Sequence, residues 1–177
     1  MKSVVGRGRS YCVVCLIASV ALATIVALLN YGGEVRAQEA KPDPAVDRAR
    51  AQVKMIDSLY KTAVVSITNR YDGPPAIKVA KDVFDAMKKE GWHDAKLVDA
   101  SGEPQNEANL PQTEFEKRAA EVIKSGKPYY EEVSGTGANR VFNAATVVPA
   151  VVKKCATCHG MEVGDLLGFI RYELPIK

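Results

Sequence analysis

The stretch Cys155-Ala156-Thr157-Cys158-His159 limits what this chain can fold into more than any other part of the sequence. Two cysteines three positions apart, with a histidine directly after the second, are the attachment signature of c-type haem. Each thiol adds to one vinyl group of the porphyrin, and the histidine supplies an imidazole, a standard axial ligand of haem iron. The motif therefore predicts one covalent haem c held by Cys155 and Cys158, with His159 as the proximal iron ligand.

Three other interpretations of this stretch compete with haem attachment. A Cys-x-x-Cys pair occurs in thioredoxin-like redox proteins, but these need a βαβ context and no trailing histidine. A closed zinc site needs four nitrogen or sulfur ligands, and after residue 37 the chain offers only His93 beyond this cluster. The third alternative is a chance occurrence in a packed core. The complete five-residue motif favours haem over all three.

The N-terminus has the composition of an export segment. Lys2, Arg7 and Arg9 precede an apolar run over residues 12–29, and the small-x-small sequence of residues 35–37 follows it. A charged start, an apolar middle and a small-residue cleavage site are typical of a secretory signal. The apolar run is also long enough to cross a bilayer, so an uncleaved membrane anchor is the alternative.

These features divide the chain into a signal peptide or anchor at residues 1–37 and one haem domain at residues 38–177. We expect the domain to be exported to the periplasm, where c-type haem is attached, with the positive flank left in the cytoplasm. Residues 1–37 hold four of the 24 basic and one of the 21 acidic residues, so the domain carries 20 of each. A domain without a basic excess is not typical of a nucleic-acid-binding protein.

Helices are predicted in the first part of the domain. Asp43 and Pro44 are typical of a helix start, and apolar residues then recur at steps of three and four as far as Tyr71. A second helix is indicated over residues 77–87. Further along, Thr113 has a glutamate three positions later, which is the capping-box pattern of a third helix.

Strands are predicted mainly in the second part. Strand-like patterns are found at residues 95–99, 129–133, 140–148 and 170–176. Helices first and strands later favour an α+β fold, with an antiparallel sheet flanked by helices. The alternative is a cytochrome c′-like four-helix bundle, which also carries its haem motif near the end of the chain. Pro149 just upstream of the motif and the alternation at residues 170–176 are unfavourable to such a helix.

Several stretches together carry a family resemblance: the leading helix around residues 57–67, GEPQNEANLP at 102–111, CATCHG at 155–160 and GDLLG at 164–168. In these the chain resembles a family of exported single-haem c-type domains with a PAS-like fold. Members occur alone and as sensing modules of bacterial kinases and chemoreceptors. The resemblance implies a stand-alone PAS-like sheet with helices that enclose one haem c.

The sequence offers several candidates for the sixth iron ligand. In some members of the family a cysteine on the leading helix looks like the sixth ligand, and this chain has no cysteine there. The remaining candidates are Met55, Tyr60, Met87, His93 and Met161. His93 is the spare imidazole and is the distal candidate, although a solvated turn would also account for it. An unfilled sixth position is an equal alternative.

The expected function is electron transfer or redox sensing, and the alternative is a sensor of gases or small ligands at an open or displaceable sixth position. A redox or signalling protein in the periplasm is the expected partner, and contact with a membrane is expected only through an uncleaved N-terminal segment. We do not expect an enzyme, because a peroxidase would need a distal acid–base group and no His/Arg pair stands out in the sequence.

Overall fold

The structure, a computed structural model, describes residues 42–73 and 76–176. The predicted signal or anchor segment at residues 1–37, with its apolar run and cleavage site, lies outside the described residues. Among the residues that are described, no helix combines the length and apolar character needed to span a membrane.

The long helix α2 (Pro44–Arg70) begins as the sequence predicts. The side chain of Asp43 accepts a hydrogen bond of 2.9 Å from the amide of Ala45, and Pro44 occupies the first turn, where its missing N–H has no cost. The buried residues of α2 recur at steps of three and four, which places them on one face of the helix: Ala49, Val53, Ile56 and Tyr60.

Helix α3 (Ala76–Lys89) returns alongside α2, and its buried residues are Ala76, Ala80 and Phe84. Helix α4 (Glu114–Lys124) begins with the predicted capping box, in which the side chains of Thr113 and Glu116 each accept a hydrogen bond from the backbone amide of the other residue. Two short 3₁₀ turns, η1 (Glu107–Asn109) and η2 (Gly137–Asn139), lie in the loops.

The sheet has four antiparallel strands in the order β1-β4-β3-β2. The strands are β1 (Asp94–Asp99), β2 (Tyr129–Ser134), β3 (Val141–Pro149) and β4 (Leu166–Pro175). The last strand in the sequence thus lies between the first strand and β3. This sheet confirms the predicted α+β class and excludes the helical bundle.

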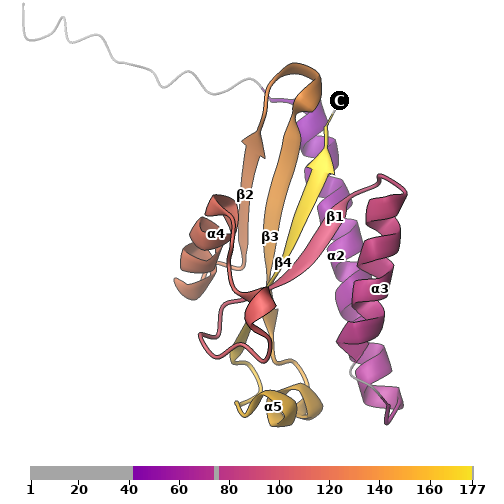
Figure 1. Cartoon of the computed structure of the whole chain (residues 1–177), viewed down its shortest axis with the longest axis vertical. Helices are drawn as coiled ribbons and strands as arrows, with labels where there is room; N and C mark the ends of the chain where they lie inside the picture. The colour runs from indigo at the N-terminus through magenta and orange to yellow at the C-terminus, as the bar shows by residue number, and fades with distance from the viewer. Residues whose placement is uncertain (1–41, 74–75, 177) are drawn as a thin grey trace, which may run out of the picture. The chain divides into compact units, whose positions relative to one another are not determined.

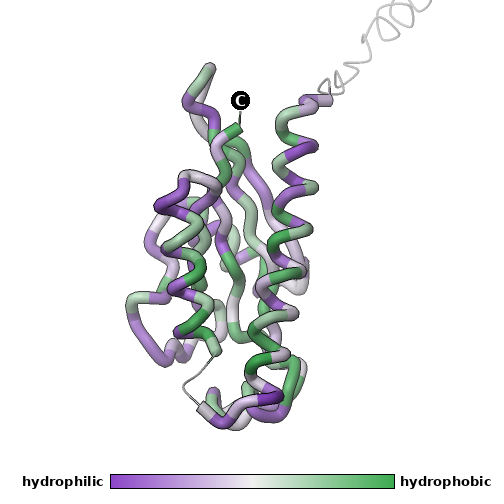
Figure 2. Tube along the Cα trace, turned by 90° about the vertical axis from the view of Figure 1, so that its right-hand side faces the viewer, coloured by the Kyte–Doolittle hydropathy of each residue, from purple (hydrophilic) through white to green (hydrophobic). Residues whose placement is uncertain are grey.

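Helices cover both faces of the sheet (Figure 1). On one face Phe142, Tyr172 and Leu174 pack in a core cluster with residues of α2 and α3. On the other face Val98 and Phe169 belong to a second cluster with residues of α4. Figure 2 shows hydrophobic and hydrophilic stretches alternating along the helices, as expected for helices that bury one side only.

Candidate functional site

The haem-attachment motif lies on a short helix, α5 (Lys153–His159), at one end of the sheet (Figure 1). This helix belongs to the segment of residues 151–164 that connects the end of β3 to the start of β4, here called the excursion. Ala150 closes the base of the excursion: its amide donates to Asp165 O over 2.8 Å, and its carbonyl accepts from the amide of Gly164 over 2.9 Å. The chain therefore leaves and re-enters the sheet region at one point.

Local backbone contacts define both ends of α5. The carbonyl of Val152 accepts from the amides of Cys155 and Ala156 at 3.0 and 3.2 Å. The helix stops at Gly160, which has φ +66°, a left-handed conformation that glycine adopts without steric cost. The amide of Met161 then donates to Ala156 O over 3.0 Å. The whole motif therefore lies within one helical run.

Helical geometry brings the predicted site residues together. Relative to Cys155, Cys158 is three positions later and His159 is four positions later. This spacing places all three side chains on one face of α5. Both cysteines are free thiols; Cys155 is partly buried and Cys158 is exposed, as is His159. Two thiols and an imidazole are thus presented together and accessible to a ligand.

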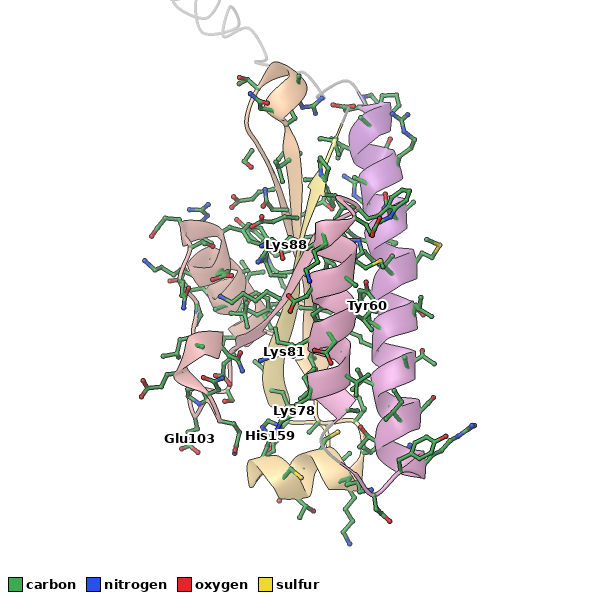
Figure 3. All side chains as sticks on the ribbon, turned by 45° about the vertical axis from the view of Figure 1, so that its right-hand side comes forward. Tyr60, Lys78, Lys81, Lys88, Glu103 and His159 are labelled. Carbon is green, nitrogen blue, oxygen red and sulfur yellow. The ribbon has the colours of Figure 1, made fainter. Side chains whose placement is uncertain are left out.

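His159 also lines a cavity of about 500 Å³. Met161 and Leu166 give this cavity an apolar part, whereas Glu103 and Lys124 bring opposite charges to it. Figure 3 shows Glu103 and His159 at the same end of the molecule, although they come from different elements. The volume is within the range of about 300–1,000 Å³ that is usual for small-molecule and cofactor sites.

Two side-chain contacts join α5 to the rest of the domain across the sequence. Gln105, in the loop before η1, places its amide nitrogen 3.5 Å from Cys158 O. Lys154 Nζ lies within hydrogen-bonding distance of three acceptors at the end of α2, at 3.2, 3.2 and 2.6 Å. Sequence patterns gave no sign of either contact, because most of the acceptors are backbone carbonyls and all of them are distant in the sequence.

His93, the distal candidate, lies away from α5. It precedes β1, whereas the cavity beside His159 is lined by Ala100, which follows β1. The intervening strand spans roughly 20 Å at about 3.3 Å per residue. The structure therefore does not bring His93 and His159 to one site.

The structure gives His93 a different environment. Its Nε2 lies 2.9 Å from the hydroxyl of Tyr60, and the side chain is only 5% exposed. Burial lowers the pKa of His93, and the nearby Asp94 only partly opposes this shift, so the neutral imidazole is favoured. The alternative prediction of a solvated turn is therefore wrong.

The other candidates for a sixth ligand are also dispersed. Tyr60 is at mid-height on α2, well above His159 in Figure 3, and Met87 packs against the core cluster between the helices and the sheet. Met55 is 65% exposed on the outer surface of α2. Met161 lines the cavity together with His159, but it is tethered two residues from that histidine.

The geometry also bears on the competing interpretations of the motif. In the described part of the chain, no three His, Cys, Asp or Glu side chains are grouped so that they could hold a metal ion. All strand pairs of the sheet are antiparallel, so the motif does not have the βαβ context of a thioredoxin-like redox pair.

Comparison with known proteins identifies a related family and a related structure. The chain matches the crystal structure of the cyanobacterial heme-protein Tll0287 with a TM-score of 0.56, at 13% sequence identity, over 76% of this chain and 97% of that one. At this identity the likeness concerns the fold. A comparison with curated proteins found no match. The model of the Tll0287-like family matches residues 33–173, which is most of the sequence. The resemblance to a known family is thereby confirmed, and the chain belongs to the Tll0287-like family.

Proposed function

We propose that this chain is an exported protein that carries one haem c, attached through Cys155 and Cys158, with His159 as the proximal iron ligand. The observation that carries this proposal is the placement of two free thiols and an imidazole on one face of α5, with His159 also lining a cavity. The related solved structure is described as a heme-protein, which adds support.

The residues present fit such a group. Haem c supplies one-electron redox chemistry and a site for small ligands at its iron. The two sulfurs would tether the ring, and the His159 imidazole would set the electron donation to the iron from the protein side. Leu166 and Met161 offer apolar contact, and Lys124 offers a cation for a carboxylate group at the ring edge.

We propose electron transfer or redox sensing as the role of the domain, with a redox or signalling protein in the periplasm as its partner. We assign residues 1–37 to export or anchoring and residues 38–177 to the haem domain. We propose no enzymatic activity. We also propose no contact with nucleic acid, because the domain has equal numbers of basic and acidic residues.

Covalent attachment tests the proposal directly. Acid-acetone extraction of the full chain should leave haem on the wild-type protein and remove it from the variant with both Cys155→Ser and Cys158→Ser. The exposed Thr157, between the two cysteines, provides the control, because Thr157→Ala keeps both thiols. Complete loss of haem from the wild type under the same extraction would show that the central assignment is wrong.

A second candidate function is a sensor of gases or small ligands at an open sixth position. It is favoured by the location of His93, Tyr60 and Met87 away from the end of the sheet that carries α5. Optical spectra distinguish the two roles. A six-coordinate low-spin spectrum in both oxidation states would favour electron transfer, whereas a high-spin ferrous form that binds CO would favour the sensor. If the wild type is six-coordinate and low spin, His159→Ala should convert its ferric spectrum to high spin.

A further inference from the structure

Lys154, the residue before the haem-attachment motif, makes a contact that its neighbour Lys153 does not. Its ammonium group lies 3.2 Å from Thr68 O, 3.2 Å from Tyr71 O and 2.6 Å from Asp72 Oδ1. Three acceptors match the three N–H groups of a lysine ammonium. Lys153 is exposed, and no hydrogen bond or ion pair of its side chain is seen in the described part of the chain.

The acceptors belong to the end of α2, where a cation is expected to bind well. The last carbonyls of a helix have no partner within the helix, and the helix dipole makes that end partly negative. Asp72 adds a full negative charge just beyond α2. Lys154 therefore donates hydrogen bonds to acceptors at the C-terminal end of α2, although it is more than 80 positions away in the sequence.

The position of Lys154 on α5 gives this contact a geometric consequence. With about 3.6 residues per turn, Lys154 and Ala156 lie roughly 100° to either side of Cys155 around the helix axis, and the motif side chains lie between them. Ala156 is only 5% exposed, so this flank of α5 is buried. Lys154 fixes the other flank against α2.

The remaining contacts of α5 restrain its rotation less. The base of the excursion is held by Ala150, but that restrains the two chain ends rather than the helix between them. The Gln105 contact to Cys158 O is 3.5 Å long, beyond the usual range of about 2.7–3.2 Å for such bonds. Lys154 makes the shortest side-chain contact between α5 and another part of the described domain.

We propose that Lys154 is a positioning residue of the haem site: by binding the end of α2 it fixes the rotation of α5 about its own axis. That rotation sets the direction in which the two thiols and the imidazole point. The inference rests on the proposed function for its effect on haem, but the rotation can be measured on the thiols alone.

Two readouts on the full chain test the proposal, with Lys153→Met as the matched control. In the haem-loaded protein, Lys154→Met should shift the reduction potential and change the ferric optical spectrum. In chain produced without haem, iodoacetamide should alkylate the exposed Cys158 faster than the partly buried Cys155, and Lys154→Met should reduce this difference. Lys153→Met should behave as wild type in both, and Lys154→Arg, which keeps the cation, should restore most of the wild-type behaviour.

The outcomes separate this proposal from the proposed function. If Lys154→Met matches Lys153→Met in both readouts, Lys154 has no positioning role, even where the substitution lowers the thermal stability. If the wild type carries no covalent haem, the proposed function fails, and the alkylation rates of the haem-free chain still decide whether Lys154 orients α5.

Discussion

Glu116 is a buried carboxylate on which several groups converge. Only 1% exposed, it accepts hydrogen bonds from the amides of Gln112 and Thr113 at 2.8 and 3.2 Å and from Lys96 Nζ at 3.2 Å. The guanidinium of Arg171 lies 3.6 Å away. Burial raises the pKa of Glu116, but the hydrogen bonds and the lysine charge outweigh it and lower the pKa below its ordinary value of 4.5. The ionised carboxylate therefore joins the start of α4 to the sheet.

We predict that Glu116→Gln lowers the free energy of unfolding at pH 7 by roughly 1.5–3 kcal/mol, the range for hydrogen bonds to charged groups. Glutamine can still serve in the capping box, so the loss reports the charge. The contribution of an ionised group with a lowered pKa is complete above pH 4.5 and disappears as the pH falls through the folded-state pKa.

Urea denaturation at a series of pH values measures this effect. The variant and the wild type should therefore converge in stability as the pH falls through the folded-state pKa of Glu116, which lies below 4.5. The control is Glu114→Gln, whose exposed side chain pairs with Lys117 in solvent and should contribute little to stability. A deficit that stays the same from pH 7 to the acid end of the series would rule out the charge as its cause.

The surroundings of His93 show where prediction from single residues fails. Trp92 is 63% exposed and His93 is 5% exposed, the reverse of what their polarity suggests. Once α3 has ended, the direction of each side chain depends on the register of β1, and the hydroxyl that contacts His93 comes from Tyr60 on another helix. By contrast, Cys155, Cys158 and His159 could be assigned together because their relation is local.

Gly168 sets the spacing of two strands. It lies in β4, opposite Asp99 of β1 and Val148 of β3, and a Cβ atom built on it would lie 2.1 Å from Val98 O. We predict that Gly168→Ala lowers the free energy of unfolding by about 1–3 kcal/mol, because the β1 backbone must move to admit the methyl group.

Denaturant titration provides the measurement, and Gly73→Ala is the control. Gly73 has open space around its Cα and no positive φ, so alanine there should be neutral or stabilise by up to about 1 kcal/mol. If Gly168→Ala proved as stable as the control, the close approach of β1 and β4 at this point would be contradicted.

At the level of elements, features that neighbouring residues determine could be predicted from the sequence, whereas features that depend on distant residues could not. The start of α2 at Asp43 and the capping box of α4 are set by neighbouring residues, and both predictions are confirmed. The sequence did not indicate α5, because Pro149 marks the preceding stretch as non-helical and only seven residues form the helix. The insertion of β4 between β1 and β3 has no local signal at all.

At the scale of the whole molecule, we predict that haem-loaded protein is found outside the cytoplasm. The positive charges and apolar run of the N-terminal segment are typical of an export signal, and c-type haem is attached on the far side of the membrane. Cell fractionation would measure the location, and N-terminal sequencing would show whether the chain begins at Gln38 or keeps its anchor. Haem-loaded protein in the cytosol of intact cells would contradict this scheme.

The closure of the excursion at Ala150 also makes the site modular. Because residues 151–164 start and finish beside the same backbone hydrogen bonds, we expect the four-stranded sheet to form with other sequences in the excursion. We therefore expect that the length and composition of the segment that bears the thiols and the imidazole can change without shifting the register of β3 against β4. For protein design, residues 151–164 could be transferred to another antiparallel strand pair that is closed by two such backbone hydrogen bonds. The acceptors for Lys154 would then have to be built into the new protein.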